Sequence, residues 1–125
     1  MPPIAGVHTA ITSQVLAAAF EVSNTLGAGF LEKVYERALL RELSLRGLLA
    51  IAQKPQTVTY KGECVGDYYP DILVEDAVIV ELKCVECFAP EHMAQCLNYL
   101  KASQKRICLL LNFQRPRLQY KRLIL

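Results

Sequence analysis

The order of hydrophobic and polar residues predicts two helices in the first third of the chain. Residues 8–25 repeat apolar side chains at helical spacing, and Leu26-Gly27-Ala28-Gly29 then interrupts the pattern, as glycines after a helix commonly do. Residues 30–46 continue as a second helix that ends at Gly47. One side of this second helix is predicted to be apolar, with charged residues on the others. The apolar side holds Leu31, Val34, Ala38 and Leu45, and the charged residues are Glu32, Glu36 and Arg37.

After the second helix the spacing changes to the alternation typical of strands. A strand is predicted at 57–60, followed by a turn at Lys61-Gly62-Glu63. Two further strands contain Ile72-Leu73-Val74 and Val78-Ile79-Val80, and the short segment Glu75-Asp76-Ala77 joins them as a hairpin. The sequence therefore predicts a group of three consecutive strands in the middle of the chain.

The last third of the chain predicts one more helix and two more strands. Pro90 suits the first turn of a helix, which would run to about residue 103. The strongly apolar run 106–112 predicts a buried strand, and 118–125 predicts an edge strand. The predicted order is ααβββαββ, which one mixed sheet flanked by helices would accommodate within a single α/β (α+β) domain over residues 1–125.

The length of the hairpin turn decides where its charged residues point. With a three-residue turn, the pairs Val74 with Val78, Ile72 with Val80 and Pro70 with Leu82 form a wholly apolar face. The pairs on the other face are Leu73 with Ile79, Asp71 with Glu81 and Tyr69 with Lys83. A two-residue turn would put Asp71 and Glu81 on opposite faces. The three-residue turn is favoured because it gathers apolar residues alone on one face, which can then be buried.

Two carboxylates opposed on neighbouring strands repel each other unless a counter-charge is present. Lys83 lies close enough to help, and a divalent cation would neutralise the pair better. Oxygen ligands suit Mg²⁺ or Mn²⁺, whereas Zn²⁺ usually takes His or Cys ligands. Beside such a metal, Lys83 could stabilise the negative charge of a phosphate under attack. The alternative is a surface patch with a weak lysine–carboxylate pair.

Composition limits the classes of function. The chain has 125 residues and a net charge of +2 at pH 7, and no uncharged apolar run is long enough to span a membrane. Neither is a secretory signal expected at the N-terminus. No acidic residue follows Glu91, so the C-terminal quarter is basic and could bind phosphate, or could be a solvated edge. The five cysteines predict reduced thiols in a cytoplasmic protein.

Pro70-Asp71, followed after a gap by Glu81-Leu82-Lys83 in an α-β-β-β-α-β order, resembles the PD-(D/E)xK nuclease superfamily. The segment Gly29-Phe30-Leu31-Glu32-Lys33-Val34-Tyr35 is similar to the name-giving motif of the small GxxExxY proteins. Further matches are Val85-Glu86, Pro90-x-His92-x-Ala94-Gln95, Asn98-Tyr99-Leu100-Lys101 and Leu111-Asn112-Phe113. Ser23 departs from the histidine expected there. Together the matches cover nearly the whole chain.

This resemblance implies a restriction-endonuclease-like core and a role for individual residues. Asp71 and Glu81 would bind the metal, and Lys83 would be the catalytic lysine. Glu32 would complete the acidic cluster as a metal ligand and catalytic group. Gln95 would face the site from the helix that follows.

Three further residues are left open between function and structure. Tyr35 shares a helix face with Glu32, and it either packs beside the metal or is a half-buried core residue. His92 and Tyr99 share a face with Gln95, and they either meet the substrate or belong to a solvated stripe. Cys84-Val85-Glu86-Cys87 could bind a metal or act as a redox pair, but alternation puts Cys84 on the apolar face, where a small buried side chain is the better interpretation.

The leading hypothesis is a small nuclease, dependent on Mg²⁺ or Mn²⁺, that hydrolyses phosphodiester bonds with weak sequence specificity. Its expected partner is nucleic acid, with DNA favoured over RNA, and a homodimer is an option; no membrane partner is expected. The nucleic acid is predicted to contact Lys101, Arg106, Arg115 and Arg117. The alternatives are a non-catalytic nucleic-acid-binding module, a protein-interaction subunit that docks through its apolar first helix, and a Cys-x-x-Cys redox or metal protein.

Overall fold

The computed structural model describes residues 8–125, which form three helices and seven strands. Residues 1–7, which also bear on the expectation about a secretory signal, lie outside the described residues. The helices are α1 (Thr9–Leu26), α2 (Glu32–Leu45) and α3 (Pro90–Ser103). The strands are β1 (Ala50–Ala52), β2 (Gln56–Tyr60), β3 (Glu63–Tyr68), β4 (Ile72–Val74), β5 (Val78–Lys83), β6 (Ile107–Asn112) and β7 (Gln119–Ile124).

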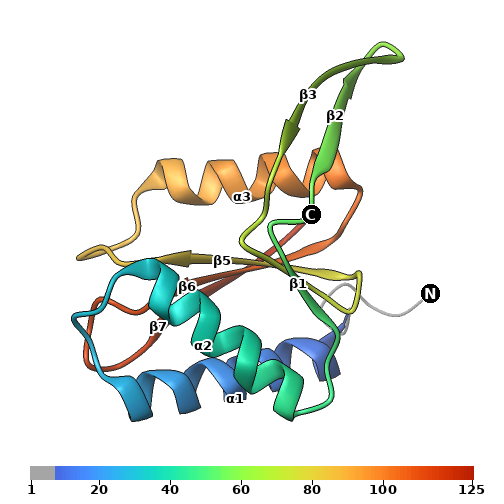
Figure 1. The fold of residues 1–125 in the computed structure, drawn as a ribbon. Helices are drawn as coiled ribbons and strands as arrows, with labels where there is room; N and C mark the ends of the chain where they lie inside the picture. Colours follow the sequence, from blue (N-terminus) through green and yellow to red (C-terminus); the bar gives the residue numbers. More distant parts are fainter. Residues whose placement is uncertain (1–7) are drawn as a thin grey trace.

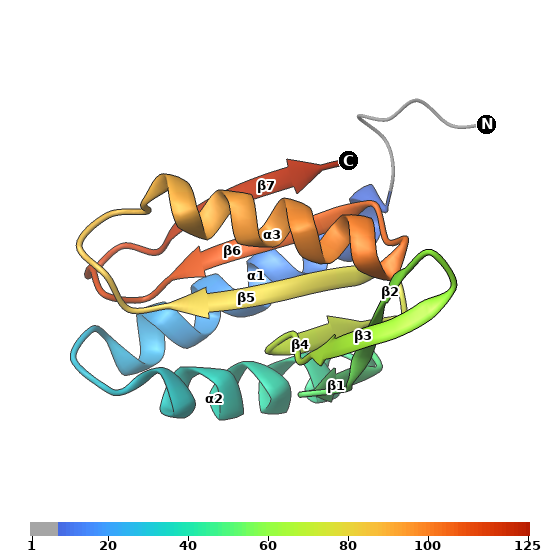
Figure 2. The same cartoon turned by 90° about the horizontal axis from the view of Figure 1, so that it is seen from above.

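Five of the strands form one mixed sheet in the order β1-β4-β5-β6-β7. β5 and β6 run parallel, and the other neighbouring pairs run antiparallel. Helices α1 and α2 cover one face of this sheet and α3 covers the other, while β2 and β3 form a separate hairpin that projects from the layers (Figures 1 and 2). The predicted fold class, a mixed sheet flanked by helices, is confirmed. None of the described helices is both long and apolar enough to cross a membrane.

The inner strands β5 and β6 contribute to the hydrophobic core on both faces of the sheet, because helices cover both faces at their position. Val80 and Leu82 of β5 belong to the cluster packed on α1 and α2, whereas Ile79 belongs to the cluster beneath α3. All six residues of β6 are buried, which explains why its sequence is almost continuously apolar. A parallel pair needs a long crossover connection, and α3 supplies it.

The β4–β5 hairpin has the three-residue turn that the apolar face favoured. Val74 pairs with Val78, and Ile72 pairs with Val80, so Glu75-Asp76-Ala77 closes an odd-length loop. Glu75 and Asp76 both have positive φ, of 53° and 52°. Glu75 also exchanges two hydrogen bonds of 2.7 Å with the backbone of Leu49, which hold the turn in this conformation.

The hairpin ladder is shorter than predicted. It ends at the pair Ile72 and Val80, so three expected strand pairs do not form: Asp71 with Glu81, Pro70 with Leu82 and Tyr69 with Lys83. Pro70 has no backbone N–H to donate and therefore cannot continue the ladder. Tyr69 is instead exposed.

Two strands were missed by the sequence pattern. β1 has only three residues, and β3 has the sequence ECVGDY, of which only the last residue is buried. A strand with this little burial shows no apolar alternation, and Gly66 and Asp67 are poor strand formers. Their partners explain why they form: β1 pairs with β4, and β3 pairs with β2.

The predicted apolar side of α2 was wrong. Leu31, Val34 and Leu45 are exposed, whereas Tyr35, Leu39 and Leu43 are buried. These three follow the i, i+4, i+8 spacing of a helix face, and α1 and the sheet select that face rather than the neighbouring one.

Candidate active site

The candidate site lies where β5 extends beyond β4. Because β4 begins at Ile72, opposite Val80, residues 81–83 of β5 have no β4 partner. Asp71 lies just before β4 and directs its side chain into this gap. Its Oδ2 accepts a hydrogen bond of 2.8 Å from the backbone N–H of Leu82. The carboxylate of Asp71 therefore replaces a neighbouring strand at the end of the hairpin.

Glu81 presents a second carboxyl group at the same place. Glu81 is only 6% exposed, and its Oε1 is buried without a hydrogen-bond partner among the described residues. Burial raises the pKa of Glu81 to about 9, and the charge of Asp71 and a hydrogen bond with its carboxyl group contribute to the rise. At neutral pH the metal-free pair therefore retains one proton. A buried pair of this kind is typical of functional sites.

Lys83 is on the same strand face as Glu81, since residues two apart on a strand point the same way. Ile79, on the same strand face, packs with Cys96 beneath α3, so Glu81 and Lys83 lie on the α3 side of the sheet. In agreement, the pKa of Cys96 is lowered by a hydrogen bond from Cys108 and, to a smaller extent, by the ammonium of Lys83, while burial opposes both. In the part of the chain that the structure describes, no acidic side chain is within ion-pair distance of Lys83.

A small pocket opens beside Asp71 on the α2 side. Its lining consists of Glu32, Lys33, Glu36, Gln53, Asp71 and Leu82. Glu32, the predicted helix carboxylate, is thus at the pocket. Burial raises the pKa of Cys84 and the charge of Glu32 adds to this, so Glu32 also lies near Cys84.

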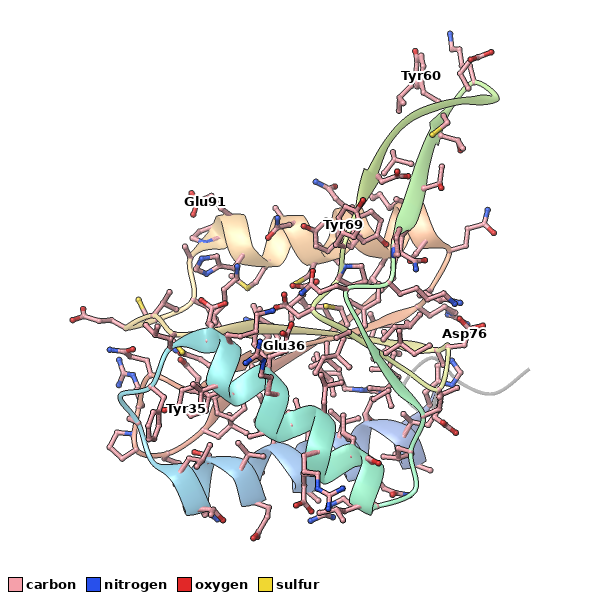
Figure 3. The ribbon with its side chains drawn as sticks, viewed as in Figure 1. Tyr35, Glu36, Tyr60, Tyr69, Asp76 and Glu91 are labelled. Carbon is pink, nitrogen blue, oxygen red and sulfur yellow. The ribbon has the colours of Figure 1, made fainter. Side chains whose placement is uncertain are left out.

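Glu36 is a pocket residue that the sequence placed on the charged side of its helix. It is 5% exposed and rises from α2 toward the sheet (Figure 3). Its Oε2 accepts a hydrogen bond of 2.6 Å from Lys33, and its Oε1 accepts one of 2.9 Å from Gln53. The available signal was the spacing of four residues between Glu32 and Glu36, which puts both on one helix face.

Helix α3 contributes polar groups from the other side of the sheet. Gln95 donates a hydrogen bond of 2.7 Å to the Tyr99 hydroxyl. Burial raises the pKa of Tyr99, and the charges of Glu81 and Asp71 raise it further, which places this hydroxyl near the carboxyl pair. Tyr68, which the sequence did not single out, stacks on the Tyr99 ring at 4.1 Å and donates to the Tyr99 carbonyl.

His92 and Tyr35, which the sequence left open between function and structure, both make contacts that support the fold. The His92 Nδ1 accepts a hydrogen bond of 3.0 Å from the N–H of Ala89, so His92 caps the start of α3. Tyr35 is fully buried, and its hydroxyl donates to the carbonyl of Gly27 at 2.6 Å. Tyr35 therefore fixes the loop between α1 and α2.

The predicted nucleic-acid-binding residues divide between the two ends of the sheet. Arg115 and Arg117 are exposed in the loop after β6, at the end where β5 terminates in Lys83. Arg115 donates a hydrogen bond of 2.9 Å to the carbonyl of Glu86. Lys101 and Arg106 lie at the other end, because the parallel register puts Ile107 opposite Val78. These two groups are separated by about the length of a strand, roughly 17 Å for six residues.

The cysteines follow the apolar pattern rather than a metal-binding one. Cys84 packs against the α1/α2 core, as predicted, while Cys87 is exposed. All five cysteines are free. Among residues 8–125, no group of three or more His, Cys, Asp or Glu side chains is arranged to hold a metal ion.

Asp71 and Glu81 nevertheless fit a hard divalent cation. Their oxygens are the ligand type that Mg²⁺ and Mn²⁺ prefer. The unpartnered Oε1 of Glu81 is a buried acceptor that a cation would satisfy. One or two carboxylates completed by water or substrate oxygens are a usual Mg²⁺ arrangement.

Comparison with known proteins assigns the chain to a class of proteins. The family model of the PD-(D/E)XK nuclease superfamily matches residues 9–123. The chain therefore belongs to this superfamily. No curated protein matches the chain.

Two solved structures resemble the fold. One is an alkaline exonuclease (LHK-Exo) from Laribacter hongkongensis, with 14% sequence identity and a TM-score of 0.51 over 90% of this chain and 81% of that chain. The other is LHK-Exo in complex with dAMP, with 13% identity and a TM-score of 0.50 over 90% and 82% of the two chains. At this identity the likeness concerns the fold alone.

Proposed function

We propose that this protein is a metal-dependent nuclease that hydrolyses phosphodiester bonds of DNA or RNA, and that it is a GxxExxY member of its superfamily. The observation that carries the proposal is the carboxyl pair at the end of β5. Glu81 is buried with an unpartnered oxygen beside Asp71, and Lys83 follows on the same face without an ionic partner among the described residues. A structural hairpin has no use for this arrangement, because burying an unpaired carboxyl group is costly.

In the proposed mechanism Asp71 and Glu81 would hold Mg²⁺ or Mn²⁺, and Glu32 at the pocket would support the ion. A bound divalent ion would lower the pKa of a water and neutralise charge on the phosphate. Lys83 would place its ammonium beside the phosphate oxygens that gain charge during the attack. Gln95 would act through the Tyr99 hydroxyl, to which it donates a hydrogen bond.

The proposed setting follows the same reasoning. Residues 1–125 would act as one domain in the cytoplasm, in keeping with five free cysteines. DNA is the favoured substrate, and a homodimer is an option because the chain is small. Arg115 and Arg117 lie at the site end of the sheet and would take the phosphates next to the cut.

One observation favours the rival function, a nucleic-acid-binding module without catalysis. Within residues 8–125 no three acidic or metal-ligating side chains are arranged to hold a metal ion. Such a module would keep the fold and the basic loop, and its binding would not need a divalent ion.

The two functions are separated by a cleavage assay on labelled single-stranded, double-stranded and branched DNA and on RNA. The protein is treated with EDTA, and Mg²⁺ or Mn²⁺ is then added back. The nuclease proposal expects cutting that needs the ion and falls by about 10²–10³-fold in Asp71→Asn and Lys83→Ala. Lys61→Ala, in the exposed turn between β2 and β3, is the matched single-charge control and should keep its activity. A contaminating nuclease would instead cut equally in every preparation, the Asp71→Asn and Lys83→Ala variants included. If no substrate is cut with either ion, the enzyme proposal is wrong and the binding module replaces it.

A further inference from the structure

Gln53 has an unusual backbone conformation at the edge of the candidate site. It follows β1 and has a φ of 54°, in the left-handed region that non-glycine residues rarely adopt. Holding a residue there costs stability, and such strain concentrates at functional sites. Gln104, at the end of α3, has nearly the same conformation, with a φ of 61°, but lies at the other end of the sheet.

This conformation directs the Gln53 side chain to two carboxylates on different elements. Its Nε2 donates to Oε1 of Glu36 at 2.9 Å and, at the longer distance of 3.4 Å, to Oδ1 of Asp71. The backbone N–H of Gln53 also donates to the carbonyl of Asp71 at 3.1 Å. One residue therefore connects α2 with the segment just before β4.

The chemistry of the amide suits this position. Two carboxylates that line one pocket repel each other, and an amide can donate one hydrogen to each without adding charge. Lys33 already pairs with Oε2 of Glu36 at 2.6 Å, so the amide connects the other oxygen of Glu36 to Asp71 without bringing a second positive charge that would compete with a cation. The second oxygen of Asp71 accepts from the N–H of Leu82, so both of its oxygens are held.

We infer that Gln53 is a positioning residue, whose amide orients Asp71 and Glu36 toward the pocket for divalent-ion binding. The inference rests on the proposed function, since it needs a metal site at Asp71. The strained residue is also the one whose backbone N–H and side-chain amide both donate to Asp71. Groups that orient metal ligands typically change metal affinity by about 10–100-fold when removed.

Gln53→Gly tests this inference because it removes the amide and the backbone strain together. Relief of the positive φ raises the melting temperature and loss of the hydrogen bonds to Glu36 and Asp71 lowers it, so the deciding measurement is Mn²⁺ affinity. Calorimetry on the intact protein should show that affinity fall about tenfold or more. Gln53→Met keeps the length and the strain but cannot donate, and it should lose Mn²⁺ affinity to the same extent. Gln104→Gly is the matched control, which relieves a similar positive φ at the other end of the sheet and should leave Mn²⁺ affinity unchanged.

Three results would overturn the inference. If wild type binds Mn²⁺ and Gln53→Gly binds it equally well, Gln53 does not position the site, and the proposed nuclease function still stands. If Gln53→Gly loses Mn²⁺ affinity but Gln53→Met does not, the backbone conformation rather than the amide is responsible, and the inference is wrong. If wild type binds no Mn²⁺, the metal-dependent function and the inference fall together.

Discussion

Asp71 and Glu81 bring their carboxyl groups together although no strand pair joins the two residues. The ladder stops at Ile72 and Val80, and Asp71 reaches β5 with its side chain by accepting the Leu82 N–H. This contact leaves a carboxyl pair at an open end of the sheet, where a substrate or ion can approach.

The metal-free protein should lose stability as the pH rises. Glu81 has a pKa of about 9 in the folded chain against 4.5 as an ordinary value, so between these values unfolding releases a proton. The folded state binds more protons in this window, and the free energy of unfolding therefore falls with pH, by up to about 1.4 kcal/mol per unit from this group. Urea unfolding in EDTA between pH 5 and 9 measures it. Glu81→Gln should flatten the curve, and an equally steep curve in that variant would assign the effect to another group.

Divalent-ion binding should strengthen with pH for the same reason. A metal ligand must be ionised, so Mn²⁺ has to displace the proton of the Glu81–Asp71 pair. Affinity is expected to rise about tenfold per pH unit between roughly pH 6 and 8. Calorimetry in buffers of different ionisation enthalpy should show about one proton released per ion. A pH-independent affinity would mean that the ion binds away from Glu81.

Nucleic-acid binding should depend more on the loop after β6 than on the C-terminal end of α3. The double variant Arg115→Ala/Arg117→Ala should weaken binding and reduce the slope of log affinity against log salt by about two, since each phosphate contact contributes about one. Fluorescence anisotropy across a salt series measures this slope. The matched control is Lys101→Ala/Arg106→Ala, which removes the same charge at the far end. A larger effect from that control would place the nucleic acid elsewhere.

Tyr35→Phe should destabilise the fold without weakening the metal site. The change leaves the Gly27 carbonyl and the Phe30 N–H without their hydroxyl partner, at a cost of about 1–3 kcal/mol. The ring remains stacked on Phe113, at 4.7 Å, so the fold should persist. Thermal melting gives the loss, and Mn²⁺ affinity should match wild type. Tyr120→Phe, at a partly exposed edge tyrosine, should have little effect on either measurement.

Much of this arrangement could be predicted from local pattern. Apolar residues alternating through Val74 and Val78 could be buried together only with an odd-length turn, and that turn fixes Asp71, Glu81 and Lys83 relative to the sheet. The all-apolar run of β6 likewise predicted a strand buried on both faces. In both cases burial acts on neighbouring residues, so the sequence records it directly.

Other features depended on contacts between distant segments. Several faces of α2 carry apolar residues, and only packing against α1 and the sheet selected Tyr35, Leu39 and Leu43 and buried Glu36. β3 shows no burial pattern because it pairs with β2 outside the main layers. Gln53 is 18 residues from Asp71 and 17 from Glu36, and no local spacing predicts that one amide joins them.

The sequence by itself thus determined the fold class and the position of Asp71, Glu81 and Lys83 at the end of the β4–β5 hairpin, because alternation and turn length are local properties. Only the tertiary structure decided what surrounds them. The ladder that stops short of Pro70, the pocket wall from α2 and the amide of Gln53 result from long-range packing, in which side-chain environment is set by neighbours far away in the chain.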